Sequence, residues 1–157
     1  QRLALLTYRI WYPGENTLLD AINDTLMEAD VRPGKLTVRS LPGEVPLFES
    51  EVRRLLSGSE RPTGLICRGL TWAEAADRAA KSLGLSVPGD VTIIHEERGI
   101  GGVRPSPYPC IARSRDEFQT ARMVTRMLSD LAEGKPLEEK HVRLPVELRL
   151  PVPTRSD

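Results

Sequence analysis

The hydrophobic and polar positions of the chain change period several times, and each change predicts a new element. Short apolar or alternating runs predict strands at residues 3–7, 35–39, 64–67, 91–94, 110–112 and 142–150. Apolar residues three or four positions apart predict helices at 16–29, 46–56, 71–83 and 116–131. The run at 91–94 is the one that best suits a central strand buried on both faces.

The order of these elements indicates the fold class. Strand and helix alternate regularly up to residue 94, which is typical of a parallel sheet covered by helices on both faces. A stretch rich in glycine and proline at 98–109 then interrupts the alternation and has the character of a linker. The pattern therefore predicts an α/β domain, a three-layer Rossmann-like parallel sheet flanked by helices.

Composition and charge limit the functions that the chain can carry. Its 157 residues suffice for one domain with a core, and 22 Lys and Arg balance 22 Asp and Glu. No basic run marks a nucleic-acid surface. No apolar run approaches the ~18 residues of a membrane span, and no signal-peptide pattern opens the chain. The chain starts at Gln1 directly on a predicted strand, which we interpret as a truncated protein.

The reactive side chains point to no catalytic or metal chemistry. Cys67 and Cys110 each lie in an apolar or small-residue stretch, which predicts buried thiols in a reducing compartment, the cytoplasm. His95 and His141 lack the spacing of metal ligands, so we expect neither a metal site nor a cofactor. No nucleophile elbow, acid/base carboxylate pair or phosphate loop stands at a working spacing, and we expect no enzyme.

Six segments carry recognisable sequence motifs in a fixed order. They read QRLALL at 1–6, RPTGLIC at 61–67, LGLSVPGDVTII at 83–94, YPCIARS at 108–114, LAEGKPL at 131–137 and VRLPVEL at 142–148. In this order and at these spacings they resemble the C-terminal half of the effector-sensing domain of the lactose-repressor (LacI/GalR) family of bacterial transcription regulators.

The resemblance implies an organisation and a set of partners. Residues 1–103 and 142–157 would form the C-terminal subdomain of a domain like the type I periplasmic binding proteins. Residues 104–135 would be the crossover segment and its helix. A small-molecule effector would bind between this subdomain and a second one, and cleft closure would change how a homodimer presents itself to DNA. DNA would be contacted only by an N-terminal domain that this chain lacks, and no membrane partner is implied.

Ligands of such open parallel sheets sit beyond the carboxyl ends of the strands. The candidate ligand-binding residues follow the first, third and fourth predicted strands and are Tyr8, Arg9, Trp11, Arg68, Trp72, Glu97 and Arg98. An aromatic pair with arginine and glutamate is suited to stack on a ring or to pair with an acid.

The chain departs from the family pattern at the positions that usually contact effector. Leu18 stands where the family has an arginine, and Gly69-Leu70 replaces an Asn-Asp pair. Glu97 aligns with the first aspartate of the family's G-F-D-D motif. Because charged and amide side chains hold a polyol by several hydrogen bonds, these losses argue against an ordinary sugar site.

Several alternatives stay open at this point. The effector is something other than a sugar, or small-molecule control has been lost and the sensor serves only dimerisation. Trp72 has an alternative role in packing against the sheet. Glu97 and Arg98 have an alternative role as a surface ion pair. An exported solute-binding protein of related fold is the competing class. The apolar face of the helix at 116–131 is expected to be covered by exchange between two copies or by folding back on its own chain.

Overall fold

The computed structural model describes residues 2–8, 14–29, 36–97, 105–113, 117–137 and 146–151. The chain forms two compact units, Gln1–Glu96 and Glu97–Asp157. The elements of the first unit are β1 (Leu3–Tyr8), α1 (Gly14–Glu28), β2 (Leu36–Leu41), α2 (Val45–Leu56), β3 (Gly64–Cys67), α3 (Leu70–Ser82) and β4 (Thr92–Glu96).

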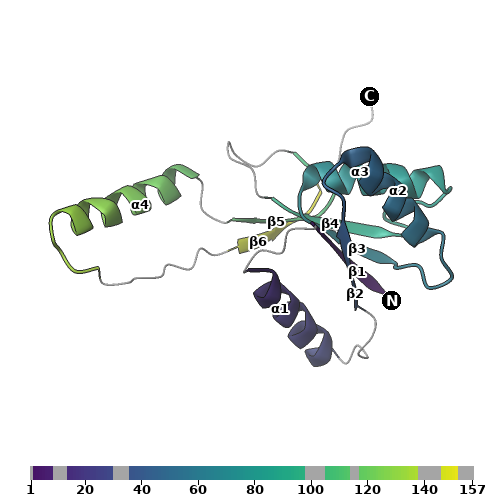
Figure 1. Cartoon of the computed structure of the whole chain (residues 1–157), viewed down its shortest axis with the longest axis horizontal. Helices are drawn as coiled ribbons and strands as arrows, with labels where there is room; N and C mark the ends of the chain where they lie inside the picture. The colour runs from purple at the N-terminus through teal and green to yellow at the C-terminus, as the bar shows by residue number, and fades with distance from the viewer. Residues whose placement is uncertain are drawn as a thin grey trace. The chain divides into compact units, whose positions relative to one another are not determined.

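The strands of the first unit form a parallel sheet in the order β2-β1-β3-β4. From β1 the chain moves to one side to reach β2, then crosses back over β1 to β3 and continues to β4. Right-handed crossovers place α1 on one face of such a sheet and α2 with α3 on the other. Figure 1 shows α2 and α3 side by side, and these two helices pack against each other and α3 against β3 and β4. The predicted α/β fold class is therefore confirmed.

The core of this unit lies on the face that α2 and α3 cover. Every second strand residue there is at most 1% exposed, and the set is Ala4, Leu6, Leu65, Cys67, Ile93 and His95. Val52 and Leu56 of α2 and the alanines of α3 are buried as well. Small side chains on α3 let the helix approach the strands closely, which explains why an alanine-rich helix packs on a sheet of larger residues.

The strand predicted at 91–94 differs from expectation in position and burial. β4 spans Thr92–Glu96, and its burial alternates, with Thr92 exposed and Ile94 half-buried. The expectation that 91–94 is buried on both faces is therefore wrong, because the helices α2 and α3 cover only one face of β4. The remaining boundaries in this unit agree with the sequence pattern to within two residues.

The second unit contains β5 (Cys110–Arg113), α4 (Glu117–Ala132) and β6 (Val146–Arg149). β5 and β6 pair antiparallel, from Cys110 opposite Arg149 to Arg113 opposite Val146. Gly134 follows the end of α4, and its φ of 72° is the left-handed conformation that commonly closes helices. Residues 142–145 of the last predicted strand, and 98–104 of the predicted linker, lie outside the described residues.

The apolar side of α4 is open. Phe118 is 67% exposed and Leu128 61%, and Val124 and Leu131 are exposed too. These are the side chains whose spacing predicted an amphipathic helix. The helix is therefore present as expected, and its apolar face is exposed in the part of the second unit that the structure describes.

The turn before β4 supplies a prediction on pH. Asp90 accepts hydrogen bonds from the Ser86 hydroxyl at 2.6 Å and the Ser86 amide at 2.8 Å. These two bonds hold the pKa of Asp90 below its ordinary value of 3.8. A lowered pKa in the folded state contributes stability above pH 3.8, and this stability is lost as pH falls through the folded value.

We expect Asp90→Asn to lower the free energy of unfolding at pH 7, and the difference from the native chain to shrink below pH 3.8. Urea unfolding at several pH values measures this. Ser86→Ala removes one of the same hydrogen bonds and should act in the same direction. A difference between native and Asp90→Asn chains that is the same at low and neutral pH would contradict the assignment.

Candidate functional site

Polar side chains are buried at one edge of the sheet. Among the described residues, the buried polar or charged side chains are Thr7, Arg68, Asp77 and His95. Three of these four lie at the carboxyl ends of adjacent strands: Thr7 in β1, Arg68 directly after β3 and His95 in β4. Because burying a polar group costs free energy, such a cluster marks a candidate functional site.

The topology makes this edge special. The chain leaves β1 and β3 in opposite directions, so the position between these two strands is a topological switch point of the sheet. Ligands of open α/β sheets bind at such a switch point. Arg68 stands at this place because β3 ends at Cys67.

Arg68 and Glu96 form a buried ion pair across the ends of β3 and β4. The Arg68 Nη1 atom donates to Glu96 Oε1, and the two side chains are 5% and 16% exposed. A pair this far removed from water is screened much less than a surface pair. The Arg68 side chain is the more deeply buried of the two.

The register of the strands brings these groups together. Leu6, Cys67 and His95 are paired across β1, β3 and β4, so Thr7, Arg68 and Glu96 each lie one residue beyond this row. Neighbouring positions in a strand point to opposite faces. Thr7, Arg68 and Glu96 therefore share the face opposite the buried row.

His95 and Cys67 belong to that buried row and have a different role. His95 is fully buried, and its Nδ1 lies 3.2 Å from the backbone oxygen of Glu96. Burial raises the pKa of the Cys67 thiol to about 12. The thiol therefore stays protonated at neutral pH and is a poor nucleophile, in keeping with the prediction of a buried core cysteine.

The predicted ligand-binding residues do not share one position in the structure. Tyr8 is the last residue of β1, whereas Arg9, Trp11 and Arg98 lie outside the described residues. Of the predicted set, Arg68 stands in the buried cluster.

Trp72 and Glu97 lie within the described residues. Trp72 makes a packing contact, and Glu97 makes a backbone hydrogen bond. The Trp72 ring packs against Phe48 of α2, with ring centroids 4.7 Å apart, which is the packing role weighed as its alternative. Glu97 follows β4 in the chain and donates its backbone amide to the Ile111 oxygen at 2.8 Å. Their role toward a ligand stays a prediction.

Sequence reasoning missed Glu96 and Thr7. Glu97 was chosen over Glu96 because Glu97 aligns with the first aspartate of the family's G-F-D-D motif. The available signal was the alternation of Thr92, Ile94 and Glu96 along β4. Since Ile94 pairs with Ile66, this alternation puts Glu96 on the same face as Arg68.

Gly69 explains one departure from the family pattern. Its φ of 145° and ψ of 162° lie in a region that only glycine occupies readily, and it caps the start of α3. A side chain at this position is strained, so the asparagine of the family pattern does not suit this backbone.

We expect Gly69→Ala to cost about 1–3 kcal/mol of unfolding free energy, because the alanine must hold a backbone conformation forbidden by its Cβ atom. Thermal unfolding checks this. Gly43→Ala is the matched control, since an added Cβ there meets nothing within 4 Å. Equal stability of the two variants would show that the loop before α3 relaxes freely.

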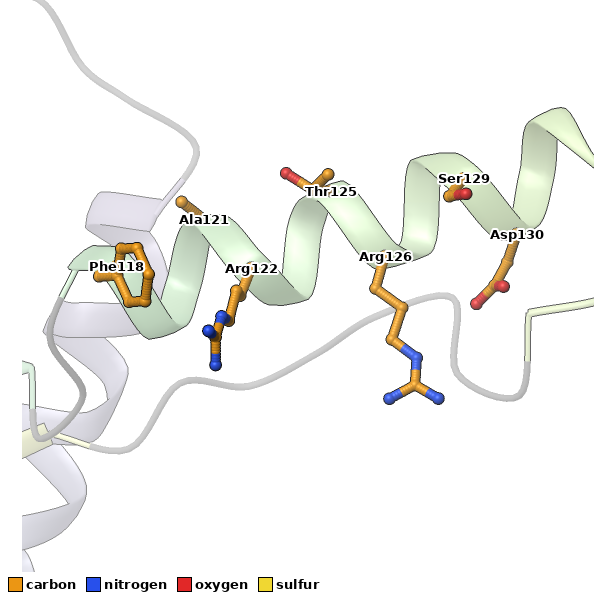
Figure 2. A pocket seen from close by; sticks show the side chains of 7 residues that line it. All are labelled: Phe118, Ala121, Arg122, Thr125, Arg126, Ser129 and Asp130. Carbon is orange, nitrogen blue, oxygen red and sulfur yellow. The ribbon is translucent and has the colours of Figure 1, made fainter.

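Two hollows lie away from the Arg68 cluster. One of about 440 Å³ opens over the amino-terminal halves of β1, β3 and β4, between Leu3, Gly64 and Ile94. The other, of about 470 Å³, follows one side of α4 and is shown in Figure 2; it is lined by Phe118, Ala121, Arg122, Thr125, Arg126, Ser129 and Asp130. Arg122 lies over the Phe118 ring at 4.9 Å from its centroid. Neither hollow contains a predicted ligand-binding residue.

Within the residues that the structure describes, no helix is both long and apolar enough to cross a membrane. The same residues bring no three metal-ligating side chains together.

Solved structures share this fold. A LacI family transcriptional regulator from Bifidobacterium animalis subsp. lactis DSM 10140 is 20% identical, with a TM-score of 0.75 over 94% of this chain and 52% of its own. A LacI family regulator from Enterococcus faecium with bound ribose is 19% identical, with a TM-score of 0.70 over 94% and 54%. The lac repressor dimer bound to operator and the anti-inducer ONPF is 20% identical, with a TM-score of 0.73 over 94% and 50%.

The chain therefore shares its α/β fold with these transcriptional regulators. It is the fold of LacI-family transcriptional regulators, over about half the length of those chains. The resemblance predicted from the six sequence segments is confirmed for the fold. No protein-family model and no curated protein matches the chain.

Proposed function

We propose that this chain is the effector-sensing part of a bacterial transcription regulator of the LacI type. The observation that carries the proposal is the buried Arg68–Glu96 pair with Thr7 at the switch point of the sheet. Polar groups gathered at this place are what an effector site needs, and the fold is that of regulators of this family.

In this proposal the effector binds between the first α/β unit and a second subdomain, and closure of the cleft changes how a homodimer contacts DNA. Residues 1–103 and 142–157 form one subdomain, and 104–135 cross over to the other. DNA contact resides in a separate N-terminal domain, and the protein acts in the cytoplasm without enzymatic activity. The exposed apolar side of α4 supports a crossover helix that packs on a second subdomain.

One observation favours a second candidate, a vestigial sensor that serves only dimerisation. Arg68 is already paired with a carboxylate of its own chain, and Gly69 and Leu70 occupy the positions of the family's Asn-Asp pair. An ion pair within the chain, at the place where an effector would bind, stabilises the carboxyl ends of the strands in one conformation without any ligand.

The parent reading frame upstream of Gln1 separates the classes of protein. We expect about 60 residues of basic helix-turn-helix sequence followed by a first α/β subdomain. A charged segment, an apolar stretch and a small-residue cleavage site would instead indicate an exported solute-binding protein.

Thermal unfolding of the parent protein with sugars, carboxylic acids and nucleobases then separates a working sensor from a vestigial one. A ligand at 100 times its Kd should raise the stability by about 2.7 kcal/mol and change operator affinity. A stable dimer that binds operator and responds to none of the ligands would support the dimerisation role.

A further inference from the structure

A buried cation and the amino end of a helix follow the end of β3. The Arg68 guanidinium is 5% exposed, and α3 starts two residues later, at Leu70. The amino end of a helix carries about half a positive charge. Here it has no side-chain cap at Gly69 and no acidic residue in its first turn. Within the first unit, Glu96 is the carboxylate that pairs with Arg68, and Glu97 follows it directly in the chain.

The positions of the two paired groups suggest which of them can exchange. Glu96 is 16% exposed and lies nearer to solvent than Arg68. Solvent therefore reaches the Glu96 side chain more readily than the Arg68 side chain. Rotation of the glutamate away from Arg68 returns its charge to water, while Arg68 stays in place at the end of β3.

A group that takes the place of Glu96 must be an anion. A buried charge that loses its partner is strongly destabilising, and a neutral hydroxyl does not replace the lost charge. A carboxylate matches the planar fork of the guanidinium and can also accept from amides at the start of α3. A neutral polyol has no such advantage at this position.

We propose that the effector site takes a small carboxylic acid, whose carboxylate replaces that of Glu96 on Arg68. Glu96 acts as a resident competitor that holds Arg68 in the absence of ligand and sets a threshold concentration for the acid. This inference rests on the proposed function for its biological meaning, although the binding itself can be measured on this chain alone.

The test is a titration of the 157-residue chain, observed through the side-chain Nε–Hε signal of Arg68 in NMR spectra. The probes are acetate for the carboxylate, inorganic phosphate as a second anion and ribose as a neutral polyol, all at constant ionic strength. Because this chain supplies one side of the cleft, we expect acetate to bind in the millimolar range. Acetate should shift the Arg68 signal, and ribose should leave it unchanged.

Three variants give the decisive comparisons. Glu96→Gln keeps an acceptor for Arg68 and removes the competing charge, so acetate should bind about tenfold more tightly than to the native chain. Glu60→Gln is the matched control, because the Glu60 side chain pairs with Arg2 and is 81% exposed. This substitution should leave acetate affinity unchanged. The double change Arg68→Met with Glu96→Leu replaces the pair by apolar groups and should abolish acetate binding. Because this variant has no Arg68 signal, acetate binding is monitored through the backbone amide signals at the start of α3.

Each contrary result overturns the inference. Equal acetate affinity of native and Glu96→Gln chains would show that Glu96 does not compete, and acetate binding that survives in the double variant would place the ligand elsewhere. Phosphate binding that exceeds acetate binding would reassign the site to phosphoryl ligands.

The inference and the proposed function fail separately. If Glu96→Gln gains acetate affinity but no acid alters operator binding by the parent protein, the acid site stands and the regulatory role does not. If the parent responds to a neutral ligand and no form of this chain binds acetate, the regulator stands and the acid site does not.

Discussion

Glu96→Ala is expected to destabilise the first unit by about 3 kcal/mol, since it leaves the Arg68 guanidinium buried without its carboxylate. This value is at the low end for a buried pair because Glu96 retains 16% exposure and water can partly reach the site. Urea unfolding followed by circular dichroism measures the difference.

Two further variants show that the cost comes from the orphaned charge. The double change Arg68→Met with Glu96→Leu should bring the stability back to within about 1 kcal/mol of the native chain, because apolar replacement of a whole buried pair is often neutral or better. Glu60→Ala breaks the exposed pair with Arg2, 3.0 Å apart, and should cost under about 1 kcal/mol. A Glu96→Ala chain no less stable than Glu60→Ala would mean that Arg68 is easily hydrated.

Phe48→Ala is expected to cost about 3–5 kcal/mol, because Phe48 is a large side chain of α2 that is only 3% exposed. Its ring is tilted by 47° against Trp72, so the substitution opens a cavity between α2 and α3. Phe48→Leu fills most of that space and should cost far less. Leu47→Ala is the matched control, since Leu47 is the preceding residue and is 51% exposed; it should change stability by at most about 0.5 kcal/mol.

Tryptophan fluorescence gives a second readout of the same contact. In a Trp11→Phe background the emission comes from Trp72 alone, and Phe48→Ala should shift it to the red as water reaches the ring. An unshifted spectrum together with a small loss of stability would show that Trp72 packs chiefly on other groups, and would reopen its predicted role toward a ligand.

The α/β class could be read from sequence because periodicity and burial agree over most of the chain. In α3 the alanines recur at helical spacing. In β3 the short apolar run at 64–67 starts with a glycine, and this pattern is typical of a buried strand. These patterns need no knowledge of what lies opposite. The helix α4 was predicted for the same reason, although nothing in its spacing says what covers it.

The candidate site could be predicted only in part. Arg68 was identified because it follows a strand, and residues after parallel strands meet at one edge. Glu96 was not, because its role depends on how far β4 extends and on its register with β3, and both depend on hydrogen bonds between distant segments. Trp72 was assigned to a ligand on its position after β3, whereas the ring lies against Phe48, 24 residues earlier in the chain.

The sequence by itself determined the alternation of strands and helices, the neutral charge, the apolar setting of the two cysteines and Arg68 as the residue that follows β3, since each of these is a local property. Only the tertiary structure decided that the guanidinium of Arg68 is buried against Glu96 and that Gly69 must be glycine. The register between β3 and β4 and the start of α3 set those two features, and a one-residue shift of either strand would turn these side chains to the other face.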